Sequence, residues 1–120
     1  MILDKVTARK FVNRKIQRTR NECEMGRRNV SFNLTTDQVM KVLETQNFKC
    51  ALSGQDLEFT TGGSLDGKNP NSCSIDRIDN SRGYESGNIQ LTTVRVNLLR
   101  NKMTNQGFID LCKQIANHCG

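Results

Sequence analysis

Asp76 and Asn97 are the two residues of this sequence whose side chains best suit a metal-dependent reaction. One carboxylate and one amide oxygen, completed by water and a phosphate oxygen, form the hard-oxygen site that Mg²⁺ prefers. A lone cation of this kind can polarise a scissile phosphate and stabilise the leaving oxygen. In the alternative, structural interpretation, Asp76 pairs with Arg77 or Arg95 and Asn97 caps a turn. Residue types alone favour this alternative, since surface Asp and Asn are common.

The segments around these residues predict how they could be brought together. Residues 73–78 alternate like a strand, 79–87 form a polar loop, and 88–91 form a second short strand. Thr92 or Thr93 can cap a small helix that carries Asn97 and ends at about residue 100. A strand, loop, strand and helix in this order can place Asp76 opposite Asn97 across the junction of hairpin and helix.

Helices are expected on both sides of this unit. Residues 4–24 contain no glycine or proline and carry a narrow apolar stripe. Residues 35–46 begin with Thr35 and Gln38 at the spacing of a capping box. Apolar residues recur at helical spacing again from about 103 to 118, whereas 60–71 is rich in glycine and asparagine and is expected to be a loop. The chain is therefore predicted to be a single α+β domain.

The stretch from Ser74 to Leu91, SIDRIDNSRGYESGNIQL, followed by NLLR at 97–100, resembles the HNH (His-Me finger) endonuclease motif. Segment 48–54 is similar to the element that precedes this motif in small phage nucleases. The resemblance covers about residues 48–101 and is closest to the PacI-like branch, in which Asp-Arg replaces the usual Asp-His. It implies a ββα-metal (HNH) core at about 72–101, with flanking helices and a C-terminal helix at about 104–118.

The same resemblance implies roles for individual residues. Asp76 and Asn97 would be the ligands of Mg²⁺ or Mn²⁺, and Asn88 would brace the loop by hydrogen-bonding its backbone. Gly83 and Gly87 would supply turn conformations that are costly for other residues. The implied catalytic residues are Asp76, Arg77, Asn88 and Asn97.

Arg77 departs from the family's usual pattern, because it stands where most members have the histidine that activates water. A guanidinium stays protonated at physiological pH, so Arg77 cannot be a general base. It can still hold the scissile phosphate, or the charge of the transition state, through a bidentate contact. Tyr84 is expected to pack the loop rather than act as a nucleophile. His118, the single histidine, is expected to be uninvolved.

The second departure concerns zinc. Related proteins often carry two C-x-x-C pairs, where this chain has Cys50 with Ser53 and Thr93 with Val96. Because close pairs of ligands normally build a structural zinc site, we expect no structural zinc and an apolar core in its place. The five cysteines are expected to be reduced thiols.

Basic residues are concentrated at the start of the chain. The net charge is +6, and residues 1–30, with nine Lys or Arg and three acidic residues, account for all of it. A basic segment on a neutral body is typical of a nucleic-acid binder, although a solvated helix face would give the same pattern. We predict a basic N-terminal helical arm at 1–30 and an HNH-like domain at 31–120. The predicted DNA contacts are Lys10, Arg14, Lys15, Arg18, Arg27, Arg28 and Arg100.

These features predict a metal-dependent HNH endonuclease that nicks or cuts DNA, and that is phage-encoded and cytoplasmic. The competing hypothesis is a catalytically weakened or inactive HNH-fold module that only binds DNA, and the scarcity of aromatic residues disfavours RNA binding. No membrane partner is expected, because the apolar runs are too short to span a bilayer and the N-terminus lacks the apolar stretch of a secretory signal. A homodimer is a candidate assembly, since a single ββα site acts on one strand.

Overall fold

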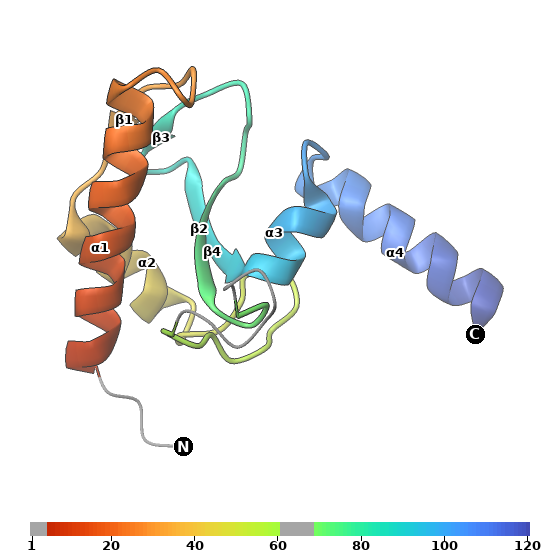
Figure 1. Cartoon of the computed structure of the whole chain (residues 1–120). Coiled ribbons are helices and arrows are strands. Elements are labelled where there is room, and N and C mark those ends of the chain that lie inside the picture. Colours follow the sequence, from red (N-terminus) through yellow and green to blue (C-terminus); the bar gives the residue numbers. More distant parts are fainter. Residues whose placement is uncertain (1–4, 61–68) are drawn as a thin grey trace.

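The computed structural model describes residues 5–60 and 69–120 and has a mixed α+β fold, as expected (Figure 1). Residues 61–68 of the expected loop at 60–71 lie outside the described residues. The elements in chain order are α1 (Lys5–Glu24), β1 (Phe32–Asn33), α2 (Thr36–Thr45), β2 (Cys73–Arg77), β3 (Tyr84–Glu85), β4 (Ile89–Thr93), α3 (Val94–Arg100) and α4 (Asn105–Cys119).

Strands β2 and β4 form an antiparallel pair in the middle of the molecule (Figure 1). Their register runs from Cys73 opposite Thr93 to Arg77 opposite Ile89, so β4 extends two residues beyond the expected strand. Helix α3 follows at once, because the Thr93 side chain accepts a hydrogen bond from the amide of Val96 and caps the helix. The expected order of strand, loop, strand and short helix is therefore present.

Helix α1 packs against α2 and β1, and its apolar stripe lies in the core. Ala8, Phe11, Val12 and Ile16 are all buried there. The predicted basic arm is thus anchored to the rest of the molecule through one face and exposes its basic residues on the other.

A second, two-stranded sheet joins the N-terminal part of the chain to the polar loop at 79–87. Strands β1 and β3 run parallel, with Phe32 paired to Tyr84. The two rings are in contact, with centroids 5.7 Å apart. Gly83 lies so close to this junction that an added Cβ would come within 2.7 Å of the Ser31 carbonyl oxygen. A larger residue at 83 would therefore push the loop away from β1.

Helix α2 begins with the capping box that the sequence predicts. Thr35 accepts a hydrogen bond from the amide of Gln38, while the Gln38 side chain accepts one from the amide of Thr35. The helix buries Val39, Met40 and Leu43 in the same core as α1.

Three of the four places that correspond to the zinc pairs of related proteins lie in or beside the apolar core. Cys50 and Thr93 are buried and Val96 packs against the core cluster, whereas Ser53 is exposed. Cys73, which is paired with Thr93 in the β2–β4 register, is buried in the same cluster. The amide of Ser53 donates a hydrogen bond to the Cys50 sulfur at 3.5 Å. Burial raises the pKa of the Cys73 thiol to about 12, so this side chain is a neutral, apolar filler at physiological pH.

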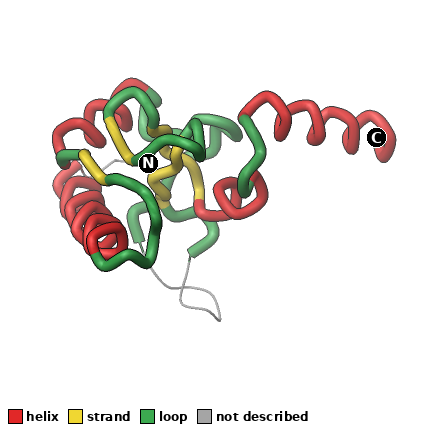
Figure 2. The backbone as a smooth tube through the Cα atoms, turned by 90° about the horizontal axis from the view of Figure 1, so that it is seen from above, coloured by secondary structure: helices red, strands yellow, loops and turns green. Residues whose placement is uncertain are grey.

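Helix α4 projects from the body, which the sequence does not predict (Figure 2). The apolar residues at its helical spacing suggest a packed face, yet no side chain of α4 is buried, and Leu111 and Ile115 are 40% and 54% exposed. The connection explains the direction of α4: Asn101, which caps the C-terminal end of α3, has a φ of 52°, and Asn105 is fixed by two hydrogen bonds to Gln90. No helix in the described part of the chain is long and apolar enough to cross a membrane.

Candidate active site

A groove of about 920 Å³ lies beside β2 and collects side chains from three parts of the chain. The lining residues belong to α1 and the segment after it, to β2 and the segments before and after it, and to α3 and the α3–α4 connection. The charged and amide side chains that line it include Lys15, Arg18, Arg28, Asp76, Arg77, Asn80, Asn97, Asn101 and Lys102.

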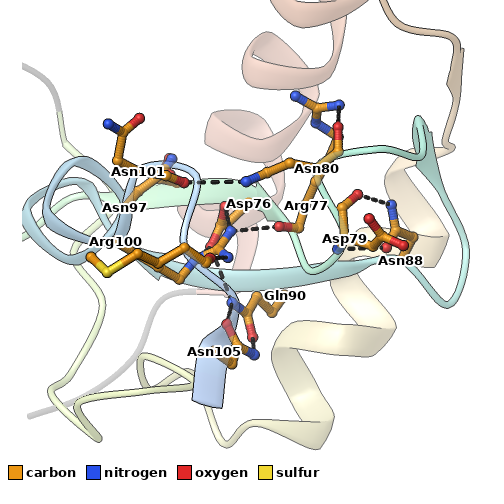
Figure 3. Close-up of polar contacts among 12 residues, drawn as sticks. Asp76, Arg77, Asp79, Asn80, Asn88, Gln90, Asn97, Arg100, Asn101 and Asn105 are labelled. Atoms are coloured by element: carbon orange, nitrogen blue, oxygen red, sulfur yellow. Dashed lines mark hydrogen bonds and ion pairs between the residues drawn. The ribbon is translucent and has the colours of Figure 1, made fainter. Parts of the chain in front are cut away.

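Asp76 is almost fully buried and is held by two neighbours that converge on its carboxylate (Figure 3). Arg100 donates from Nη2 to Oδ1 at 2.7 Å and from Nε to Oδ2 at 3.1 Å. Gln90, opposite Asp76 in the β2–β4 register, donates to Oδ2 at 3.0 Å. Asp76 thus forms an ion pair, as the structural alternative supposes, but its partner is Arg100 rather than Arg77 or Arg95.

Arg100 corrects the sequence interpretation, which assigns it to DNA binding. Its side chain is 0% exposed, so it cannot lie against a phosphate backbone. The guanidinium also donates to the carbonyl oxygens of Arg77 at 2.6 Å and Met103 at 2.5 Å. It therefore ties β2 to the end of α3. A buried carboxylate requires a paired cation, and this requirement is the one signal that could have identified Arg100.

Asn97 lies on α3 beside β2, where its side-chain amide donates a hydrogen bond to the Ser74 hydroxyl at 2.7 Å. This contact holds the side chain against the strand that carries Asp76. Both Asp76 and Asn97 line the groove. The two predicted metal ligands are therefore brought to the same surface, from β2 and α3 respectively.

Asn88 is buried and spans the polar loop with three hydrogen bonds (Figure 3). Its side-chain amide donates to the carbonyl oxygens of Asp79 at 3.1 Å and Gly83 at 2.8 Å, and its Oδ1 accepts from the Asp79 amide at 2.9 Å. The donor and the acceptor of the Asn88 side-chain amide are thus both used to fix the loop that follows Arg77. These are the backbone contacts expected of a bracing residue.

Arg77 points along the same loop. Its Nη1 donates to the carbonyl oxygens of Asn80 and Arg82, each at 2.9 Å, and its guanidinium lies 5.3 Å from the centre of the Tyr84 ring. Tyr84 is buried and its hydroxyl accepts a hydrogen bond from Arg28 at 2.9 Å. Tyr84 therefore packs between two groove-lining cations. This arrangement matches a packing role.

The basic residues near the start of the chain divide into two groups. Lys15, Arg18 and Arg28 line the groove, while Lys10, Arg14 and Arg27 are exposed outside it. Glu22 lies between two members of the first group and forms ion pairs with Arg18 and Arg28, and its pKa is lowered mainly by the hydrogen bond from Arg28. Sequence reasoning missed Lys102, a groove-lining cation that follows α3.

The oxygen atoms of Asp76 and Asn97 fit a hard cation, but only a weakly held one. Three donors already occupy the carboxylate of Asp76, which offers about four lone-pair positions. One position remains on Oδ1, and the amide oxygen of Asn97 is a second suitable ligand. Among the described residues, no cluster of three or more His, Cys, Asp or Glu side chains offers a stronger metal site.

Comparison of the chain with protein-family models, with curated proteins and with solved structures gave no significant match.

Proposed function

We propose that this chain is a metal-dependent endonuclease of the HNH type that hydrolyses phosphodiester bonds in DNA. One observation carries the proposal: Asp76, Arg77 and Asn97 line a single groove that is also lined by Lys15, Arg18 and Arg28. The side chains proposed to hold a cation thus line the same groove as basic side chains that could hold a phosphate backbone. The sequence resemblance at 74–100 supports the proposal, because it implies that Asp76 and Asn97 are metal ligands and that Arg77 stands at the position of the usual catalytic histidine.

In this proposal, Asp76 and Asn97 hold one Mg²⁺ or Mn²⁺, whose chemistry is to polarise the scissile phosphate and stabilise the leaving oxygen. Arg77 keeps Nε and Nη2 available for that phosphate, because its hydrogen bonds to the loop carbonyls use Nη1. Asn88 fixes the loop from which Arg77 receives its orientation. The cations of α1 hold the neighbouring phosphates and give affinity rather than base specificity.

A plasmid cleavage assay tests the proposal. Incubation of supercoiled plasmid with the protein and Mg²⁺ or Mn²⁺ should give relaxed or linear product, and EDTA should prevent it. Asn97→Ala should abolish cleavage with little loss of stability, since this half-buried residue makes a single side-chain hydrogen bond to Ser74. Asn117→Ala, on the exposed face of α4, is the matched control and should cleave normally.

A second candidate function is a DNA-binding module without catalysis. The observation that favours it is the ion pair of Asp76 with Arg100, because a neutralised carboxylate attracts a cation less strongly. Tight binding of plasmid by the folded protein, with no cleavage in either metal, would replace the endonuclease with this function.

A further inference from the structure

Resting on the proposed function, we propose that the groove holds its divalent cation only together with a DNA phosphate, because Arg100 cancels the charge of Asp76. Cation binding and DNA binding would then be a single coupled event. This coupling is a property of the charge arrangement in this chain.

The ion pair of Arg100 with Asp76 is buried on both sides. The side chains of Arg100 and Asp76 are 0% and 5% exposed, and the guanidinium contacts both carboxylate oxygens. Water cannot screen a pair that is buried to this extent, so the positive charge is fully felt at the carboxylate. Asp76 therefore offers a cation an oxygen atom but almost no net negative charge.

The groove around this ion pair is lined mainly by basic residues among its charged side chains. Asp76 is the single acidic residue among the groove-lining residues that the structure describes, whereas five cations line the same surface. Glu22, beside Arg18 and Arg28, offsets one of them. Even without Lys15, the charges of Arg18, Arg28, Arg77 and Lys102 outweigh that of Glu22, so the free groove is positive. A dication that enters it meets repulsion, which the neutralised Asp76 and the neutral Asn97 do not compensate.

A bound DNA phosphate would change both the charge of the groove and the ligands available to the cation. A DNA backbone in the groove would place negative charge beside the basic wall and would add phosphate oxygens to the ligands of the cation. Both changes favour cation binding. By thermodynamic reciprocity, the cation must then raise the affinity for DNA by the same factor.

The first arm of the test measures Mn²⁺ binding to the free protein from the electron paramagnetic resonance signal of unbound Mn²⁺. The wild-type protein should show no saturable binding below millimolar Mn²⁺. Arg100→Gln keeps hydrogen-bond donors for Asp76 but removes the charge, and it should bind Mn²⁺ at least about tenfold more tightly. Arg95→Gln, an exposed residue of the same helix, is the matched control and should resemble wild type.

The second arm uses only the wild-type protein, so it stands even if Arg100→Gln does not fold. Submillimolar Mn²⁺ should broaden the NMR signals of the Asn97 side-chain amide when a short random-sequence DNA duplex is present, and should not do so without it. The side-chain amide of Asn117, on α4, serves as the internal control for Mn²⁺ carried by the duplex itself.

The outcomes separate the inference from the function on which it rests. Broadening of Asn97 to the same extent without DNA would overturn the coupling and leave the proposed function in place. Equal Mn²⁺ affinity for folded Arg100→Gln and wild type would overturn the role of Arg100. Absence of broadening both with and without the duplex would remove the cation from this groove and overturn both proposals.

Discussion

At the scale of single residues, the carboxylate of Asp76 has two roles. It lines the groove, and it also neutralises the fully buried guanidinium of Arg100. A buried charge that loses its partner is strongly destabilising, whereas replacing both partners with apolar groups of similar volume is often tolerated. Loss of activity in a variant at residue 76 is therefore no sign of a metal ligand unless stability is measured as well.

Asp76→Ala should lower the free energy of unfolding by about 3–5 kcal/mol, because it leaves the Arg100 guanidinium buried and unpaired. The double variant Asp76→Ala/Arg100→Met should recover a large part of that loss. Urea unfolding followed by circular dichroism measures both. Equal loss of stability in the single and the double variant would show that the pair contributes little to the fold.

Arg77→Ala should slow cleavage about 10²–10³-fold with little change in DNA affinity, because charge stabilisation directed at the transition state acts on rate. Arg77→His restores the base that is usual in the HNH family and should retain more activity than Arg77→Ala. Single-turnover cleavage rates and binding isotherms provide the two readouts. Identical rates for wild type and both variants would exclude a catalytic role for this residue.

At the scale of helices and strands, sequence reasoning is accurate where the deciding interactions are local. The capping box of α2, the Thr93 cap of α3 and the alternation of β2 involve residues within a few positions of each other. The partner of Asp76 depends instead on how α3 packs against β2, and the exposure of α4 depends on the turn at Asn101. Neither feature leaves a periodic signal in the sequence.

Helix α1 offers the most direct test of the proposed DNA-binding surface. Replacing Lys10, Arg14 and Arg18 with Gln should weaken binding about equally on all DNA sequences. It should also reduce the slope of log affinity against log salt concentration by about one for each phosphate that these side chains bind. The control variant Lys41→Gln/Lys113→Gln removes exposed charges from α2 and α4 and should leave the slope unchanged. An unchanged slope in the α1 variant would mean that this face only solvates the helix.

At the scale of the whole molecule, the apolar core around Cys50 and Cys73 predicts stability without a metal. The purified protein should contain no stoichiometric zinc, and its melting temperature should not change after EDTA treatment. Metal analysis and thermal unfolding give the answer. Release of about one zinc per chain with loss of structure would show that a metal supplies folding energy here.

Four of the five cysteines should also react in two distinct classes, with the half-buried Cys23 between them. Cys112 and Cys119 are exposed on α4, so a thiol reagent should modify them rapidly at neutral pH. Cys50 and Cys73 are buried, and the Cys73 thiol, with its pKa raised to about 12, stays protonated until strongly alkaline pH. Peptide mapping after brief labelling tests this order. Early modification of Cys73 in the native protein would show that the core opens more readily than its burial implies.

The parallel pairing of β1 with β3 has a consequence for how the protein is made. Phe32 cannot pair with Tyr84 until residue 84, more than 50 residues further along the chain, has left the ribosome. Synthesis proceeds from the N-terminus, so the basic residues of α1 emerge long before the strands that complete the groove. Closing this long loop also makes the groove a late product of folding. A nascent chain would thus expose a cationic helix to cellular polyanions well before the proposed site had formed.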